Sequence, residues 1–257
     1  MLMLLETSQW LSLLTVGVSA GFIDAVVGGG GLLSIPALLS MGIPPHMALG
    51  TNKLAACFSS FTSAMTYFRQ QFFSPTLWYH CAIATFLGAV LGSTIVLMID
   101  NDWLVKMLPI MIIAVALYTA LNPNAIGCKN TQVPQSKPNK LYQWLTGFFW
   151  GGYDGFAGPG IGAFWTISSS KLFQLPLLNS CALARSMTLI SNLTALLIFL
   201  FQSKVNFTIG LAMGMFMMLG SFIGAHFAIR FGSPFIKPIF ICVVIIMSIH
   251  LAWSAWF

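Results

Sequence analysis

The chain has 257 residues, of which 58% are hydrophobic and only 6% are charged, and its net charge is +6 at pH 7. An ordinary soluble domain is about 25% charged, so this composition excludes a water-soluble fold with a charged surface. No basic run accompanies the positive balance, which argues against a nucleic-acid partner and for the loop bias of a membrane protein.

Long apolar segments recur along the whole chain, and each is near the roughly 20 residues that a spanning helix needs. In chain order they cover residues 10–27, 46–68, 75–98, 103–121, 141–158, 177–201, 206–229 and 235–256. Shorter apolar runs near 32–41 and 163–173 each follow a glycine-rich break. We therefore predict an all-α, polytopic integral membrane protein with eight long spans and up to ten segments.

Residues 122–140 interrupt this pattern with three lysines, three prolines and almost no apolar side chain. Such a composition is typical of a loop. We expect it to be the polar linker between a first transmembrane repeat, residues 1–121, and a second, residues 141–257. Each repeat would hold four long helices and one short, glycine-broken segment.

The two halves carry the same motifs at a nearly constant spacing. Gly21, Asp24, Gly28 and Gly30 match Gly151, Asp154, Gly158 and Gly160 at a shift of 130. Lys53 matches Arg185, and Gly88 and Gly92 match Gly220 and Gly224, at a shift of 132. Three separate motifs at nearly the same spacing indicate a duplicated bundle, which is common in secondary transporters.

Two topologies follow from whether the short runs cross the membrane. If they do not cross, the repeats share an orientation, and Lys and Arg residues divide five to four between the two sides. If they cross, the repeats are inverted and the division is seven to two. Because cytoplasmic loops are enriched in Lys and Arg, we predict inverted repeats with both termini periplasmic and residues 122–140 cytoplasmic.

Asp24 and Asp154 are the only acidic residues inside the long apolar segments. Asp24 follows Trp10 by 14 residues, which places it about 21 Å along a helix, well inside a hydrocarbon core of about 30 Å. A charge at the centre of a span costs roughly 2.5 to 3.5 kcal/mol on insertion scales. We expect each carboxylate to accept hydrogen bonds from backbone amides freed at the glycine break, to handle substrate or protons, or to do both.

Glycine clusters follow both acidic residues. The positions concerned are Gly28, Gly29, Gly30, Gly31, Gly158 and Gly160. Unhindered backbone amides with a helix N-terminus behind them can hold an anion, and close helix packing is the alternative use of small residues in lipid. Neither cluster has the G-K-[ST] ending of a P-loop.

Lys53 and Arg185 occupy equivalent positions near the start of a long segment in each half. Each cation either snorkels to the membrane interface, or pairs with an aspartate or meets an anionic substrate. A basic residue at both equivalent positions favours pairing or substrate binding. Asn52 and Asn192 are polar neighbours that can complete a site, although their positions are not equivalent.

The two G-x-x-x-G motifs, at Gly88–Gly92 and Gly220–Gly224, predict faces of close helix packing. The four histidines share no ligand spacing, and the five cysteines include no C-x-x-C pair. We therefore expect no metal site, cofactor or disulfide framework.

These motifs resemble those of the TauE/SafE sulfite-exporter family of bacterial membrane transporters. The resemblance covers at least residues 10–232 and rests on G-F-I-D-A-V-V-G-G-G-G-L-L-S-I-P-A-L-L, A-L-G-T-N-K, Y-D-G-F-A-G-P-G-I-G and G-S-F-I-G-A. The nearest branch is the one described as probable membrane transporter proteins, without an assigned substrate. Arg185 departs from the commoner lysine but keeps the charge. The resemblance implies a multi-pass protein of the bacterial inner membrane, with some relatives linked to export of sulfite, sulfoacetate or related anions.

Together these features predict a secondary transporter of a small anion, an organosulfur or sulfite-like oxyanion among the candidates, bound between the repeats near the midplane. Asp24 and Asp154 would fix the broken segments or carry protons. Lys53 and Arg185 would supply positive potential, and the glycine amides would bind oxyanion oxygens.

A membrane-embedded enzyme and an anion channel are the alternatives. No H-E-x-x-H, no G-x-S-x-G and no closely spaced pair of catalytic carboxylates occurs, so we expect no enzymatic activity. The expected partners are the small anion and the lipid bilayer, and homo-oligomerisation stays open.

Overall fold

The computed structural model describes residues 7–108, 110–111, 138–232, 235–236 and 238, and its regular elements are all helices. They are α1 (Thr7–Val26), α2 (Gly30–Ser40), α3 (Pro45–Arg69), the 3-10 turn η1 (Pro75–Leu77), α4 (Tyr79–Leu97), α6 (Lys140–Phe156), α7 (Ile161–Leu172), α8 (Leu177–Phe201) and α9 (Phe207–Phe231). Each predicted span that one of these helices covers begins and ends within a few residues of that helix. The spans predicted at 103–121 and 235–256, and the linker 122–140, lie largely outside the described residues.

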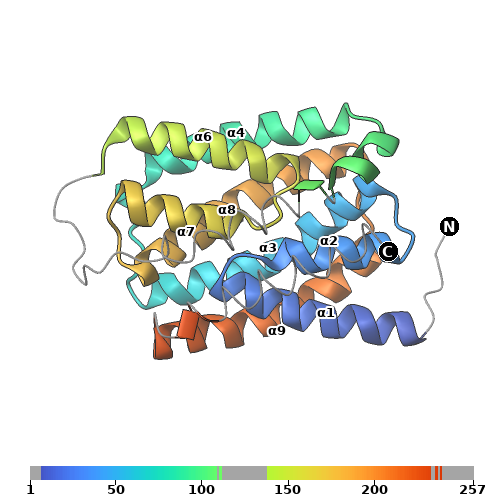
Figure 1. The fold of residues 1–257 in the computed structure, drawn as a ribbon, viewed down its shortest axis with the longest axis horizontal. Helices are drawn as coiled ribbons and strands as arrows, with labels where there is room; N and C mark the ends of the chain where they lie inside the picture. The colour runs from blue at the N-terminus through green and yellow to red at the C-terminus, as the bar shows by residue number, and fades with distance from the viewer. Residues whose placement is uncertain (1–6, 109, 112–137, 233–234, 237, 239–257) are drawn as a thin grey trace.

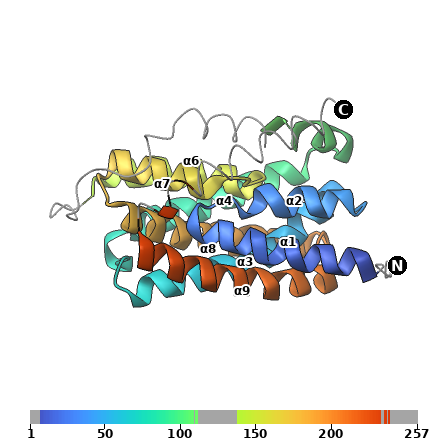
Figure 2. The same cartoon turned by 60° about the horizontal axis from the view of Figure 1, so that its bottom comes forward.

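The helices lie side by side with their axes along the long dimension of the molecule (Figure 1). In Figure 1, α1 begins at the right-hand end and α6 begins at the left-hand end. A view turned by 60° shows the same bundle, with α1, α3 and α9 forming one side of it (Figure 2). The first helices of the two halves therefore enter the bundle from opposite ends.

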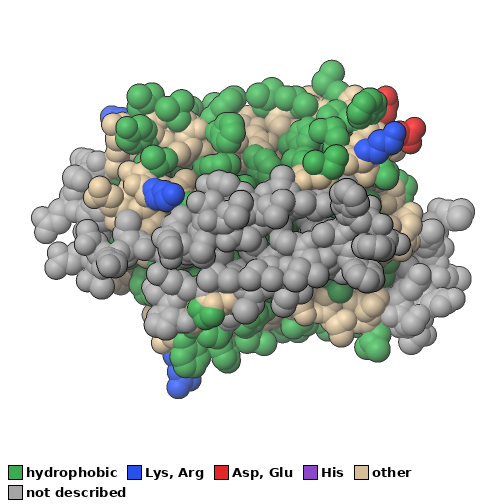
Figure 3. Space-filling model, in the orientation of Figure 1, with side chains coloured by type: hydrophobic (Ala, Val, Ile, Leu, Met, Phe, Trp, Pro, Cys, Tyr) green, Lys and Arg blue, Asp and Glu red, His purple; other side chains and the backbone are tan. Residues whose placement is uncertain are grey.

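Polarity is distributed as in a membrane protein, with apolar side chains outside and many polar ones inside. Exposed apolar residues cover the outer faces of α4, α6 and α9, for example Leu91, Phe149 and Met215. Inside the bundle, α3 buries a row of hydroxyl and amide side chains that includes Asn52 and Ser59. Figure 3 shows the same pattern on one face, where the visible charged side chains lie toward the two ends.

Three of the described helices are long and apolar enough to cross a membrane: α4, α8 and α9. Helix α3 also has 25 residues, but its interior polar row lowers its mean hydropathy. The composition and these helices together support a helical, polytopic membrane fold.

Each half begins with a helical hairpin. Leu38 of α2 packs in the same core cluster as Leu13 of α1, so α2 runs back beside α1. In the second half, the Trp150 indole of α6 donates a 3.0 Å hydrogen bond to Ser168 of α7. Helices α2 and α7 each return toward the end at which their hairpin began, because the glycine break reverses the chain.

The first helix of each half packs against a helix of the other half: α1 against α9, and α6 against α4. A Cβ atom at Gly92 of α4 would lie 2.0 Å from the carbonyl oxygen of Gly152 of α6. A Cβ atom at Gly220 of α9 would lie 2.0 Å from the carbonyl oxygen of Val18 of α1. Only glycine permits backbones to approach this closely, so both G-x-x-x-G motifs are confirmed as packing faces.

Candidate functional site

Two buried ion pairs cross between the halves of the chain. Lys53 of α3 contacts Asp154 of α6, with 2.7 Å between Nζ and Oδ1, and both side chains are 2% exposed. Arg185 of α8 contacts Asp24 of α1, with 3.1 Å between Nη1 and Oδ1. The basic residue of each half thus neutralises the acidic residue of the other half.

Neither cation reaches the membrane interface. The side chain of Lys53 is 2% exposed and that of Arg185 is 1% exposed, so the snorkelling interpretation is wrong for both. Taking two charges out of water is costly, and removing one partner of a buried pair costs about 3–5 kcal/mol because the other charge is left uncompensated. The pairs hold α1 against α8 and α3 against α6.

The Lys53 ammonium is enclosed by acceptors. It donates to Asp154 Oδ1 and to the Asp154 carbonyl oxygen, and to Asn192 Oδ1 at 3.1 Å. The second carboxylate oxygen of Asp154 accepts a hydrogen bond from Ser191. An ammonium group has three N–H donors, and three acceptors surround this one.

The Arg185 guanidinium is held differently. Its Nη1 donates to the carbonyl oxygen and to Oδ1 of Asp24. Ser59 Oγ donates to Asp24 Oδ2 at 2.7 Å. Arg185 Nε is buried and has no hydrogen-bond partner among the described residues. The Asp24 side chain is 16% exposed, eight times the fraction of Asp154.

The glycine breaks meet between the two ion pairs. Gly28 and Gly158 both have positive φ, +87° and +78°, which reverses the chain in each hairpin. The amide of Gly162 donates a 3.1 Å hydrogen bond to the carbonyl oxygen of Gly28. A Cβ atom at Gly28 would lie 2.1 Å from Arg185 Nη2, and one at Gly158 would lie 2.2 Å from Asp154 Oδ1. Glycine is therefore required for the charged groups to fit beside the backbone.

The remaining predicted positions lie around this crossing. A Cβ atom at Gly30 would approach Asp24 Cβ to 2.8 Å, and one at Gly31 would lie 3.9 Å from Asn52 Nδ2. Asn52 Oδ1 accepts a hydrogen bond from Ser34. Gly160 is the N-cap of α7, with φ of +70°. By contrast, a Cβ atom at Gly29 would meet only apolar side-chain atoms.

Among the described residues, the carboxylate oxygens of Asp24 and Asp154 accept hydrogen bonds from a serine hydroxyl group and from a basic side chain, and not from glycine amides. The hydroxyl donors Ser59 and Ser191 were missed in the sequence, as was Ser34. Ser59 and Ser191 are separated by 132 residues, the same shift that relates Lys53 to Arg185. That spacing was the available signal, but serine is so common in this chain that it did not stand out.

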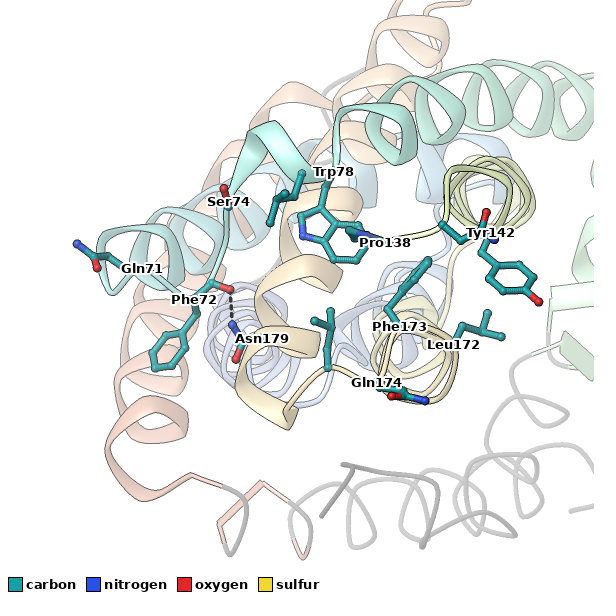
Figure 4. A pocket seen from close by; sticks show the side chains of 13 residues that line it. Gln71, Phe72, Ser74, Trp78, Pro138, Tyr142, Leu172, Phe173, Gln174 and Asn179 are labelled. Carbon is teal, nitrogen blue, oxygen red and sulfur yellow. Dashed lines mark hydrogen bonds between the residues drawn. The ribbon is translucent and has the colours of Figure 1, made fainter. Parts of the chain in front are cut away.

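Cavities lie at both ends of the bundle. One of about 430 Å³ lies where α6 begins, between the α3–η1 and α7–α8 connections (Figure 4). Its wall includes Trp78 and Phe173, whose rings meet edge-on with centroids 4.9 Å apart. A second, of about 410 Å³, lies at the opposite end and is lined by His46, Asp100 and Lys204 among others. In the described part of the chain, no group of three His, Cys, Asp or Glu side chains is placed to hold a metal ion.

The chain is similar to known membrane transporter proteins over most of its length. The family model described as sulfite exporter TauE/SafE matches residues 13–251. A protein of Sinorhizobium sp., named "Probable membrane transporter protein ORF9", is 36% identical over 233 residues, which are 90% of this chain and 88% of that protein. A "Probable membrane transporter protein" of Haemophilus influenzae is 34% identical over 246 residues, 95% of each chain.

A third relative is "Probable membrane transporter protein YfcA" of Escherichia coli. It is 33% identical over 240 residues, which are 93% of this chain and 88% of that protein. No solved structure matches the chain. The similarity spans both ion pairs and both glycine breaks.

Proposed function

The chain belongs to the sulfite exporter TauE/SafE family of membrane transporters, and from that premise we propose that it is a secondary transporter of a small oxyanion of the sulfite class. The observation that carries this proposal is the crossing of the two glycine breaks. There, the buried side chains of Lys53, Asp154 and Arg185 and the partly exposed Asp24 lie near the starts of two short helices that begin inside the bundle. Broken helices that start at a central site are a common arrangement for anion recognition in transporters.

The chemistry of the crossing suits an anion. The N-termini of α2 and α7 bring backbone amides and the positive ends of helix dipoles to the same place. Arg185 supplies a planar guanidinium, which matches oxyanion geometry better than an ammonium does. Each cation is already neutralised by a carboxylate, so the site carries little net charge when empty. An anion can therefore enter and leave without a large electrostatic trap.

We further propose that the chain is built from two inverted repeats with eight long spans and two short segments. Helices α3 and α8 have the same length and start 132 residues apart, and α1 and α6 begin at opposite ends (Figure 1). Helix α1 packs against α9 and α6 packs against α4, so each half packs its first helix against the other half. A two-fold axis within the membrane plane would produce this arrangement. The segments near 103–121 and 235–256 complete the count.

The distribution of basic residues supports an orientation in the bacterial inner membrane. Arg69, Lys140, Lys171 and Arg230 lie at or near the helix ends that face the side where α6 begins. Lys204 lines the cavity at the opposite end. By the positive-inside rule, the α6 side would be cytoplasmic. The two end cavities would then be the entrances from the cytoplasm and the periplasm.

The proposal is tested with purified protein in liposomes. Sulfite, sulfoacetate, sulfate and chloride are offered in turn under an imposed proton gradient, and empty liposomes serve as the control. We expect saturable, gradient-dependent movement of at least one sulfur oxyanion, with the anion recovered chemically unchanged. Non-saturable flux independent of the gradient would indicate a channel, and chemical conversion would indicate an enzyme. Either result would refute the proposal.

A further inference from the structure

We propose that the two ion pairs have different tasks: Arg185, with the start of α2 and Asn52, forms the oxyanion site, while the Lys53–Asp154 pair is a structural lock. This inference rests on the proposed transport function. It assigns substrate contact to one side of a site that looks symmetric in the sequence.

The Lys53 ammonium has no N–H donor left for a ligand. Three acceptors surround the ammonium, two from Asp154 and one from Asn192. Ser191 binds the second carboxylate oxygen. With 2% exposure on both side chains, the pair is closed to solvent. Such a fully satisfied, buried pair stabilises a fixed arrangement of α3 against α6.

The Arg185 side retains an unused donor. Nη1 is engaged by Asp24, and Nη2 lies against the backbones of Gly28 and Gly162. Nε is buried without a partner in the described residues. A buried donor without an acceptor is unfavourable, and it is expected where a ligand provides the missing acceptor. The Asp24 carboxylate, which pairs with Arg185, is partly exposed, so solvent reaches this ion pair.

The starts of α2 and α7 also differ in whether their backbone amides have hydrogen-bond acceptors. At the start of α7, the amides of Ile161, Gly162 and Ala163 all donate to backbone carbonyls. At the start of α2, no backbone hydrogen bond is formed by the amides of Gly29 or Gly31 within the described chain. Asn52 Nδ2 lies close to Gly31.

Open donors from the guanidinium, the backbone and an amide side chain thus lie around the α1–α2 break. They suit an anion with at least two acceptor oxygens on one small central atom, as in sulfite. One oxygen would accept from Arg185 Nε, and the others would accept from α2 amides and Asn52. Neighbouring Asp24 opposes accumulation of further negative charge, so the site would hold one anion at a time.

The first experiment needs no ligand. Lys53→Met and Arg185→Met are matched substitutions at equivalent positions, and thermal unfolding of each purified protein is measured in detergent. We expect Lys53→Met to lower the Tm several degrees more than Arg185→Met, because it leaves Asp154 buried and uncompensated whereas Asp24 retains contact with solvent. An equal loss of Tm in the two variants would overturn the division of tasks.

The second experiment measures sulfite binding by calorimetry on the full chain. Arg185→Lys keeps the positive charge but removes the Nε donor, and we expect affinity to fall about tenfold or more. Ser191→Ala, on the lock side, is the matched control and should bind sulfite as the wild type does. Unchanged affinity in Arg185→Lys, or a similar loss in Ser191→Ala, would overturn the assignment. If the wild type bound none of sulfite, sulfoacetate and sulfate, the proposed function would be refuted. The Tm comparison would still test whether the Lys53–Asp154 pair is structural.

Discussion

The substitution Gly92→Ala measures how tightly α4 and α6 are held together. A Cβ atom at this position would lie 2.0 Å from the carbonyl oxygen of Gly152 and 2.8 Å from the amide nitrogen of Phe156. Since an ordinary contact needs about 3.5 Å, the two backbones must separate by roughly 1.5 Å. A backbone carbonyl cannot rotate away as the end of a side chain can, so the whole interface has to open.

The expected cost follows from this displacement. A gap of about 0.5–1 Å already forfeits a quarter to a half of the dispersion attraction between packed atoms, and overpacking costs about 1–3 kcal/mol. We take the upper end because backbone is involved. The better helix propensity of alanine returns about 1 kcal/mol. The net loss is about 2 kcal/mol, or a fall in Tm of roughly 4–8 °C for a chain of this size.

Gly152→Ala is the control on the facing helix of the same interface. A Cβ atom there would lie 3.6 Å from the carbonyl oxygen of Gly88, an ordinary contact, so we expect an unchanged or slightly raised Tm. Thermal unfolding of both purified variants in detergent, with gel filtration to check dispersity, makes the comparison. If Gly92→Ala were as stable as Gly152→Ala, the close approach of α4 and α6 would be refuted.

Two further predictions concern the charges and the topology. Asp154→Asn leaves Lys53 buried without a counter-charge and should destabilise the protein by about 3–5 kcal/mol, whereas Asp24→Asn should stay folded but transport poorly; normal transport by both, at matched protein content in liposomes, would remove any functional role of the carboxylates. Single cysteines at Ser74 and Gln202, in a background without native cysteines, should label from opposite sides of the membrane. Labelling from one side would contradict the inverted arrangement, because these two positions follow equivalent helices.

The positions of most described helices could be predicted, because membrane-spanning helices appear in a sequence as long apolar segments. Helix α3 begins at Pro45, one residue from the predicted start, and the break at Gly28 follows from four consecutive glycines. The length of the short run does not by itself predict its path, because about 10 apolar residues are half of a full span. The distribution of Lys and Arg favoured a run that crosses back, and in the structure α2 lies beside α1 after the reversal at Gly28, whose φ is positive.

The sequence drew attention to the four charged residues that the structure brings together, but it did not predict how they pair. The repeated spacing indicated that each cation pairs with an aspartate or meets an anionic substrate, and spacing cannot tell pairing within a half from pairing across halves. The partner of Lys53 is Asp154 rather than Asp24 because α6 and α1 are exchanged between the halves. The unused Nε of Arg185 likewise depends on its packing and carries no signature in the sequence.

The crossed ion pairs also constrain biogenesis. Lys53 is synthesised about 100 residues before Asp154, and Asp24 about 160 residues before Arg185, so both charges lack their final partners while the first half is made. An unpaired charge at the centre of a span costs roughly 2.5 to 3.5 kcal/mol on insertion scales. Insertion of the early helices is therefore less favourable until the second half supplies the partner charges, which links the insertion of the two halves.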